Sequence, residues 1–316
     1  MRVVFLGTPE FAVPALRLLL ERAYKVCGVF TQPDRPSGRG QKLQPSPVKV
    51  LAQSRGIPVF QPQSIQKDEN RPIIDGLKPD FIVVAAYGQI LPGWLLHAAR
   101  LAPVNIHASL LPHYRGAAPI PWAILNGDSI TGVTTMVIRE KLDSGPILLQ
   151  QEVLISPATT AGELAAELSI VGANLLIRTL DGFRNNEIHP REQDESRATW
   201  APRITKDRAQ ISWEKRSQEI HNQIRAMNPW PTARTVFRHK RLKIWRSLPE
   251  IREGDSHELP GTVLGLSREG IRVQCGEGSV LELLELQLPA KGRVGGRAFA
   301  VGRHMTRGES FHPIQD

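Results

Sequence analysis

Short apolar runs alternate with helical patterns over the first half of the chain. The run over 81–88, "FIVVAAYG", is almost wholly apolar, as are strands buried on both faces of a parallel sheet. Strands that alternate with helices predict an open α/β fold, here a doubly wound and mostly parallel sheet. The predicted strands cover residues 2–7, 25–31, 81–88, 102–109 and 131–138, and a long helical pattern over 160–180 follows them.

A helix is predicted directly after the first strand. Thr8 is a favourable N-cap, and Pro9 suits the first helical position because its missing N–H needs no partner there. Leu16 and Leu19 belong to the apolar face of this helix. We therefore expect the helix to begin at Pro9, with Thr8 as its N-cap.

The last third of the chain has a different pattern. Residues 235–245 and 261–288 contain short apolar runs separated by Gly-containing turns, which are typical of an antiparallel barrel or sandwich. Residues 190–207 are polar and lack a clean period, so they are predicted to be a linker. The expected organisation is a first domain over 1–189, this linker, and a β-domain over 208–316.

The composition is that of an ordinary globular protein and does not by itself indicate a function. Hydrophobic residues make up 41% and charged residues 22% of its 316 residues. No apolar run approaches the ~20 residues of a membrane span, and the first residues do not resemble a signal peptide, so we expect a cytoplasmic protein. Cys27 and Cys275 lie far apart in apolar settings and are expected to be packing residues. The histidines show no metal-binding spacing, so no metal is expected.

Positive charge is concentrated in the last third. Residues 206–316 carry 19 Lys and Arg against 13 Asp and Glu, a net of +6, whereas residues 1–205 carry 21 against 18, a net of +3. The whole chain has a formal net charge of +9. Such an excess favours a polyanionic partner.

An unusual polar face follows one predicted strand. In "VNIHASLLPHYRG" (104–116), Asn105, His107 and Ser109 alternate with apolar residues and should share one face. Ligands of doubly wound sheets bind at the carboxyl ends of the strands, so this face should point into a binding crevice. The alternative is that Asn105 and His107 are satisfied polar residues at a strand end.

The residues of this face suit carbonyl chemistry better than nucleotide binding. The chain lacks GxGxxG after its first strand, GxxxxGK[ST] and GxSxG. Asp143, in "LDSG", can lie beside a neighbouring strand end, although it could equally be only a turn residue. An Asn and a His can stabilise an oxyanion, and an Asp can orient the imidazole. Such a set favours attack on a carbonyl by a nucleophile that the substrate supplies, for example an amine.

Several segments carry a resemblance to a known family. "NIHASLLPHYRGAAPI" (105–120) with "LDSG" (142–145) resembles the folate-dependent formyltransferases, which carry an Asn-x-His…Asp triad. "FLGTPEFAVPAL" (5–16), "GVFTQPDRPSGRGQKLQPSPVK" (28–49), "VVAAYGQILP" (83–92) and "NPWPTA" (228–233) are similar to the branch that acts on methionyl-tRNA. The resemblance covers nearly the whole chain.

The resemblance implies a fold, a reaction and a set of residues. The fold would be a Rossmann-like formyltransferase domain followed by a small OB-like barrel. The reaction would transfer a formyl group from 10-formyltetrahydrofolate to the α-amino group of methionyl initiator tRNA. By position, Asn105, His107 and Asp143 match the catalytic triad, and Arg115 is expected to meet the substrate. The folate-binding segment would comprise Ser109, Leu110, Leu111 and Pro112.

Two basic segments are candidates for tRNA binding. The loop over 33–46 could be only a flexible solvated loop, but in the family an inserted loop here contacts the end of the tRNA. The segment over 234–246 could be only a solvated charged face, but beside a tRNA substrate it favours phosphate contacts. The predicted tRNA-binding residues are Arg35, Arg39, Lys42, Arg238, Lys240, Arg241 and Lys243.

Other functions remain open from the sequence. A formyltransferase acting on glycinamide ribonucleotide or an amino-sugar nucleotide would keep the triad, and so would a 10-formyltetrahydrofolate hydrolase. A non-catalytic RNA-binding protein on an old enzyme fold is a further alternative, which the intact triad disfavours. No exposed apolar stripe demands a dimer, so a monomer is expected.

Overall fold

The computed structural model describes residues 1–22, 24–37, 40, 42–250 and 258–314. The chain forms two compact units. The first unit comprises Met1–Pro119, Ile130–Leu154 and Ala165–Ala201, and the second comprises Ile120–Ser129, Ile155–Leu164 and Pro202–Asp316. The segment predicted as a linker is thus divided, with its residues up to Ala201 in the first unit.

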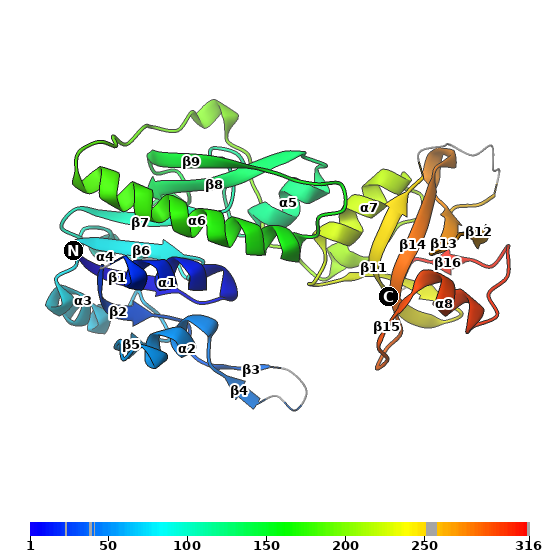
Figure 1. The fold of residues 1–316 in the computed structure, drawn as a ribbon, viewed down its shortest axis with the longest axis horizontal. Coiled ribbons are helices and arrows are strands. Elements are labelled where there is room, and N and C mark those ends of the chain that lie inside the picture. Colours follow the sequence, from blue (N-terminus) through cyan, green and yellow to red (C-terminus); the bar gives the residue numbers. More distant parts are fainter. Residues whose placement is uncertain (23, 38–39, 41, 251–257, 315–316) are drawn as a thin grey trace. The chain divides into compact units, whose positions relative to one another are not determined.

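A seven-stranded sheet forms the centre of the first unit (Figure 1). Its order is β5-β2-β1-β6-β7-β8-β9, with parallel pairing from β5 to β7 and antiparallel pairing from β7 to β9. This confirms the predicted doubly wound, mostly parallel sheet. The strands are β1 (Arg2–Gly7), β2 (Lys25–Phe30), β5 (Val59–Phe60), β6 (Phe81–Ala85), β7 (Ala102–His107), β8 (Ile130–Val137) and β9 (Ile147–Leu154).

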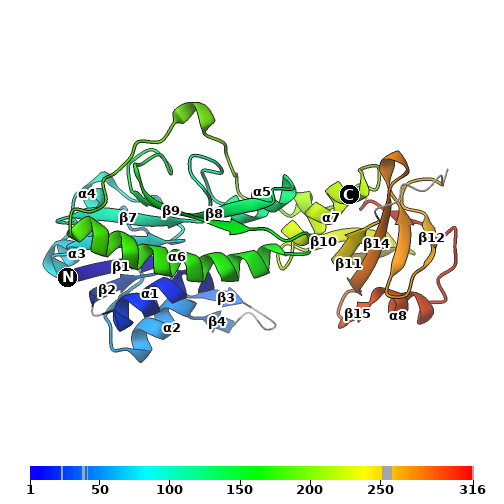
Figure 2. The ribbon, with the colours of Figure 1, turned by 45° about the horizontal axis from the view of Figure 1, so that its top comes forward.

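Helices cover this sheet, and α1 and α6 run along the same face (Figures 1 and 2). On α6, Gly172 leaves room for Ile106 and Val133 of the sheet, because a Cβ at Gly172 would lie 2.9 Å from Ile106. The helices are α1 (Val13–Glu21), α2 (Pro47–Ser54), α3 (Arg71–Leu77), α4 (Gly93–Leu96) and α6 (Ala161–Arg184), with short 3-10 turns η1 (Glu10–Ala12), η2 (Asp68–Asn70) and η3 (Glu195–Arg197).

The first helix does not begin where the sequence predicts. Thr8 is not an N-cap, because its hydroxyl donates instead to the carbonyl of Tyr87 at 3.1 Å. That bond joins the segments that follow β1 and β6, and the 3-10 turn η1 then leads into α1. The prediction failed because a long-range hydrogen bond took the hydroxyl that a cap requires.

The loop over 33–46 contains a two-stranded hairpin of β3 (Arg35–Ser37) and β4 (Lys42–Gln44). Asp34 anchors its base: the carboxylate accepts from Lys49 at 2.7 Å and from Gln61 at 2.7 Å. These charge-assisted bonds lower the pKa of Asp34, chiefly through Lys49. The hairpin is therefore fixed at its base to the rest of the first unit.

The second unit contains a curled antiparallel sheet, which confirms the predicted β-domain. Its main order is β12-β13-β14-β11-β10-β16, and β15 pairs with β14. The strands are β10 (Ala233–Phe237), β11 (Lys240–Pro249), β12 (Val263–Leu266), β13 (Ile271–Gln274), β14 (Val280–Gln287), β15 (Arg293–Gly295) and β16 (Phe311–His312). The remaining elements of the chain are α5 (Pro119–Leu125), α7 (Ser217–Ala226), α8 (Gly296–Val301), η4 (Asp207–Ala209) and η5 (Gly276–Gly278).

Both cysteines are buried and free, as expected for packing residues. Burial raises the pKa of the Cys275 thiol to about 12. In the part of the chain that the structure describes, none of the helices is long and apolar enough to cross a bilayer.

Candidate active site

Asn105 and His107 lie at the carboxyl end of β7. His107 is buried, with 6% of its surface exposed, and Asn105 is half-buried. Ile106, between them, points to the opposite face, where it meets Gly172 of α6. The two polar side chains therefore share the sheet face that is turned away from α6, as the period of two predicts.

Both ring nitrogens of His107 face oxygen atoms. Nε2 lies 2.9 Å from the carbonyl oxygen of Tyr114, and because a carbonyl can only accept, Nε2 is the protonated donor. Nδ1 lies 3.7 Å from Oδ2 of Asp143. This distance is within reach of an ion pair but too long for a hydrogen bond, so the Asp143 carboxylate faces Nδ1 without bonding to it.

Asp143 lies in the loop between β8 and β9 and meets His107 in space. Its carboxylate is mostly buried, and Oδ2 accepts a hydrogen bond from the N–H of Gly116 at 2.9 Å. Its backbone has φ 48°, in the left-handed region that Asp tolerates better than most residues. The structure thus brings together the three residues that the sequence proposed as catalytic; their catalytic role remains a prediction.

The segment predicted to bind folate is fixed by its own hydrogen bonds. The Ser109 hydroxyl donates to the carbonyl of His113 at 2.6 Å, and Thr134 donates to the carbonyl of Ser109 at 2.7 Å. Leu111 packs in a small cluster with Met136 and Ile147. Ser109, Leu111 and Pro112 are buried, while Leu110 is half-buried. Their role in folate binding stays a prediction. Of the four, Leu110 is the most exposed and so the most able to contact a ligand directly.

Arg115 does not meet a substrate, contrary to the expectation. Its side chain is fully buried, with 0% exposed, and its guanidinium is paired with Glu195 and Gln193. Glu195 in turn accepts from Lys141 at 2.7 Å. These bonds, with Arg115 the largest cause, lower the pKa of Glu195 to about 2. Sequence reasoning missed this network because its members lie up to 80 residues apart.

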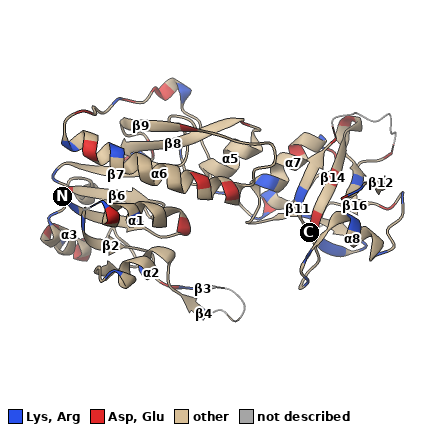
Figure 3. Cartoon of the chain, in the orientation of Figure 1, with Lys and Arg blue, Asp and Glu red and all other residues tan. Residues whose placement is uncertain are grey.

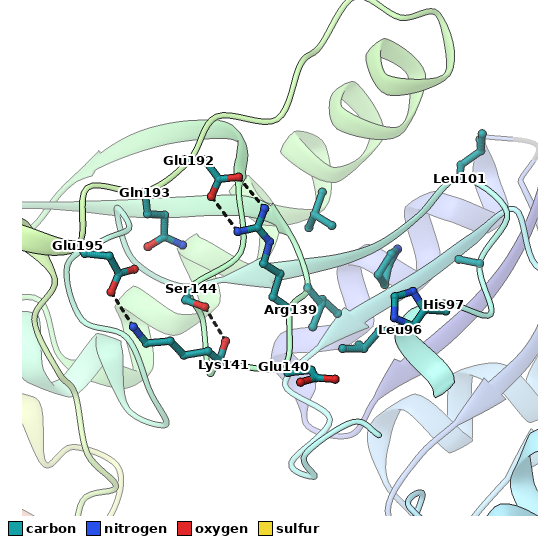
Figure 4. A pocket seen from close by; sticks show the side chains of 14 residues that line it. Leu96, His97, Leu101, Arg139, Glu140, Lys141, Ser144, Glu192, Gln193 and Glu195 are labelled. Carbon is teal, nitrogen blue, oxygen red and sulfur yellow. Dashed lines mark hydrogen bonds and ion pairs between the residues drawn. The ribbon is translucent and has the colours of Figure 1, made fainter. Parts of the chain in front are cut away.

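A cavity of about 830 Å³ opens beside this network (Figure 4). It extends from the apolar side chains of Leu96 and Leu101 to Ser144, the residue after Asp143. Ion pairs of Arg139 with Glu192 and of Lys141 with Glu195 mark its polar side. No single motif predicts it, since its lining residues come from segments 96–103, 137–144 and 192–195.

Two of the three basic residues predicted in the first unit lie on the hairpin. Arg35 and Lys42 are exposed on β3 and β4. Arg39 lies outside the described residues. The exposed side chains leave both described cations accessible to a ligand.

In the second unit, Lys and Arg gather along β11 (Figure 3). Arg238 and His239 form the β10–β11 turn with positive φ, and Arg238 pairs with Glu309 at 2.7 Å. Lys240, Arg241 and Lys243 are exposed. Arg241 and Lys243, two residues apart on one strand face, line a cavity of about 250 Å³. Arg238 is exposed as well, so all four side chains are accessible, and their role in tRNA binding stays a prediction.

No described group of three or more His, Cys, Asp and Glu side chains could hold a metal ion. At this site the described side chains offer hydrogen-bond donors and the His107–Asp143 pair. Half-buried Asn105 and buried His107 can stabilise negative charge that develops on a carbonyl oxygen. The fold and the site together define a group-transfer enzyme of the doubly wound class.

Comparison with known families identifies that class. The family model "Formyl transferase" matches residues 1–180, and "Formyl transferase, C-terminal domain" matches residues 203–304. The chain therefore belongs to the formyl transferase family.

Bacterial relatives show to which branch of this family the chain belongs. The methionyl-tRNA formyltransferase of Clostridium novyi is 48% identical over 292 residues, covering 92% of this chain and 93% of that protein. The methionyl-tRNA formyltransferase of Bacillus subtilis is 45% identical over 308 residues, covering 98% and 96%. Within the formyl transferases, the chain is a member of the methionyl-tRNA formyltransferase branch.

Solved structures share the fold at lower identity. WlaRD, a sugar 3N-formyl transferase solved with dTDP and 5-N-formyl-THF, is 21% identical with a TM-score of 0.66, and the match covers 92% of this chain and 99% of that one. HypX from Aquifex aeolicus in complex with tetrahydrofolic acid is 18% identical with a TM-score of 0.62, covering 95% of this chain and 47% of that one. At these identities the likeness concerns the fold alone.

Proposed function

We propose that this chain transfers a formyl group from 10-formyltetrahydrofolate to the free α-amino group of methionyl initiator tRNA. The observation that carries the proposal is the meeting of Asn105, His107 and Asp143 at the end of β7, in a chain of this family. The product, N-formylmethionyl-tRNA, serves translation initiation, so we expect the reaction in the cytoplasm. The enzyme is proposed to act as a monomer.

The reaction needs no nucleophile from the protein. An α-amino group has a pKa of roughly 7.7–8.0, so part of it is neutral near pH 7 and can attack the formyl carbon. A C–N bond to methionine forms, and the formyl oxygen becomes an oxyanion that Asn105 and His107 stabilise. When the intermediate collapses, the bond to N10 of the folate breaks, and the proton lost by the amine passes to N10 through His107. Asp143 orients His107 and stabilises its charged form.

The folate is proposed to bind at the carboxyl end of β7, beside Asn105 and His107, so that its formyl group lies next to both side chains. Ser109, Leu110, Leu111 and Pro112 are proposed to contribute by forming the rigid turn that borders the reacting atoms. No metal is proposed in this mechanism.

The tRNA is proposed to contact both basic regions. Arg35, Arg39 and Lys42 of the 33–46 segment would meet the acceptor end, and Arg238, Lys240, Arg241 and Lys243 would meet phosphates. The guanidinium of Arg238 also donates to Glu309 and to the carbonyl of Arg303, which fixes its position in the β10–β11 turn. Exposed cations that neutralise phosphates release counterions, so affinity should fall steeply with salt.

One assay tests the proposal. The purified chain is incubated with 10-formyltetrahydrofolate and, in parallel, with initiator Met-tRNA, elongator Met-tRNA, glycinamide ribonucleotide, a dTDP-amino-sugar or no acceptor. We expect rapid formylation of initiator Met-tRNA alone. Preferred formylation of a nucleotide would reassign the substrate, and folate consumption without an acceptor would indicate a hydrolase. Tight tRNA binding without turnover would favour a non-catalytic RNA-binding protein.

A further inference from the structure

Residues 191–201, hereafter the strap, pack against the loop that carries the candidate active site. The N–H of Arg115 donates to the carbonyl of Thr199 at 2.8 Å, and the N–H of Ala201 donates to the carbonyl of Arg115 at 2.8 Å. Gly116 has φ 117°, and a Cβ there would lie 2.9 Å from the carbonyl oxygen of Ala201. The strap is therefore held against the 112–118 segment by paired backbone groups, at a distance that only glycine permits.

Arg115 is the polar centre of this contact. Its guanidinium donates to Gln193 Oε1 at 3.1 and 2.7 Å and to the two carboxylate oxygens of Glu195 at 3.1 and 2.7 Å. A fully buried charge is tolerated only when it is paired and hydrogen-bonded, and both conditions are met here. The carbonyl end of the Gln193 amide is thereby fixed in orientation, so its NH₂ end can point in only one direction.

The NH₂ end of Gln193 points at the turn that carries Asp143. Nε2 donates to the carbonyl of Asp143 at 2.8 Å and to the carbonyl of Gly145 at 2.7 Å. An amide nitrogen has two hydrogens, so each carbonyl has a donor of its own. The two carbonyls flank Ser144, and Asp143 has φ 48°. A backbone outside the common regions persists where its surroundings determine it, and Gln193 supplies that determination.

The segment from Tyr114 to Gly116 connects this network to the imidazole. The Tyr114 carbonyl accepts from His107, the Arg115 side chain orients Gln193, and the Gly116 N–H donates to the Asp143 carboxylate. Three successive residues thus set the positions of both members of the His107–Asp143 pair. Gln193 of the strap then holds the backbone on either side of Ser144.

We infer that Gln193, held by Arg115 and Glu195, is a positioning residue that fixes the backbone of Asp143 and so its carboxylate beside His107. The inference rests on the proposed function for its kinetic consequence. Small displacements of a catalytic group cost up to about 100-fold in rate, so the effect should be visible in turnover. The strap would then support the active-site geometry, in addition to linking segments of the chain.

The variant Gln193→Glu tests the inference most sharply. It preserves the size of the side chain and the acceptor for Arg115, but it replaces the donor with an oxygen that faces two carbonyl oxygens. We expect kcat for formylation to fall about 10–100-fold, with KM for Met-tRNA and for folate changed less than about 3-fold. Arg197→Ala, an exposed position in the same strap, is the matched control and should retain wild-type turnover. An unchanged kcat, or a rise confined to KM, would overturn the inference.

A double-mutant cycle asks whether Gln193 acts through Asp143. In the Asp143→Ala background, Gln193→Glu should change kcat by less than about 3-fold, because the group that it positions is already absent. The same 10–100-fold loss in both backgrounds would assign Gln193 an effect of its own and contradict the inference.

A structural readout separates this inference from the proposed function. Amide hydrogen exchange of a peptide spanning 139–147 should accelerate in Gln193→Glu and remain at the wild-type rate in Arg197→Ala. This measurement requires no substrate, so it stands even if the wild-type chain fails to formylate Met-tRNA, which would refute the proposed function alone. Unchanged exchange in Gln193→Glu would contradict the positioning role. Because the folded state is measured directly, a variant that unfolds is recognised by exchange across the whole first unit.

Discussion

The end of β7 and the basic face of β11 present polar groups in opposite ways. At β7, His107 and Asp143 are 6% and 12% exposed, and each is tied to backbone groups of the 114–116 segment. At β11, Lys240, Arg241 and Lys243 are exposed, and the Lys243 ammonium lies over the ring of Trp245, 5.7 Å from its centroid. The first arrangement suits charge that develops at one atom, and the second suits many interchangeable phosphates.

This contrast predicts how each region responds to substitution. A buried donor aimed at one oxyanion has no substitute in a site that excludes water, so its removal should cost much. An exposed cation shares the phosphate backbone with its neighbours, so its removal should cost little and the cost should depend on salt. The following variants test that division, beginning with the largest expected effect.

Asn105→Ala should lower kcat for formylation about 100–1,000-fold, because an oxyanion donor is lost. Affinity for Met-tRNA should remain within about 2-fold of wild type, since Asn105 is uncharged and is not among the residues proposed to contact phosphates. Single-turnover formylation and filter binding of Met-tRNA measure the two quantities. Turnover near the wild-type rate would remove Asn105 from the catalytic set.

Asp143→Asn should lower kcat about 100-fold by removing the charge that faces His107. The substituted amide oxygen can still accept from the Gly116 N–H, so the loop should keep its conformation. The comparison with Asp143→Ala isolates the charge: if both variants lose the same activity, the charge and not the loop contact is responsible. A loss only in Asp143→Ala would assign Asp143 a structural role.

The fold was predictable where apolar runs are long and continuous. The strands from β1 to β8 in the central sheet and the long helix α6 were expected within a few residues, apart from the two-residue β5. Among the elements that were missed, β9 and α7 have identifiable reasons. In β9, the polar stretch Gln150–Glu152 interrupts the apolar pattern because that strand lies at the sheet edge. In α7, four of the buried side chains are His221, Asn222, Gln223 and Arg225, so the helix has few apolar residues to reveal it.

The candidate site was predictable in part. The period of two placed Asn105 and His107 on one face, and the turn chemistry of "DSG" identified Asp143 as a loop residue that can reach a strand end. The support of that loop was not predictable, because Arg115 and Gln193 are separated by 78 residues and their contact leaves no local pattern. The sequence predicted the basic residues in and after the β10–β11 turn as one group. It could not predict the pairing of Arg238 with Glu309, because the two residues are 71 positions apart.

Replacement of Arg241 and Lys243 by Ala tests the other side of the comparison. If each contacts one phosphate, the slope of log affinity against log salt should decrease by about 2, and kcat at saturating Met-tRNA should be unchanged. Arg268→Ala, an exposed Arg in the turn between β12 and β13, is the control and should leave the slope at the wild-type value. Binding titrations between 50 and about 300 mM salt measure it. Equal slopes in all three proteins would exclude phosphate contacts at β11.

The smallest expected effect is on the free energy of unfolding and concerns Glu195, a half-exposed carboxylate of the strap. The bonds from Arg115 and Lys141 lower the pKa of Glu195 to about 2, below the usual value of about 4.3. The stabilisation is therefore present above about pH 4.5 and is lost as the pH falls through about 2. Glu195→Gln should show a shallower loss of unfolding free energy than wild type over that range, measured by urea denaturation. Because Glu195 is 55% exposed, solvent screening keeps the difference small. Parallel pH curves for the two proteins would place this pair with the weak surface ion pairs, and the strap would then depend on Gln193 and the backbone bonds for its rigidity.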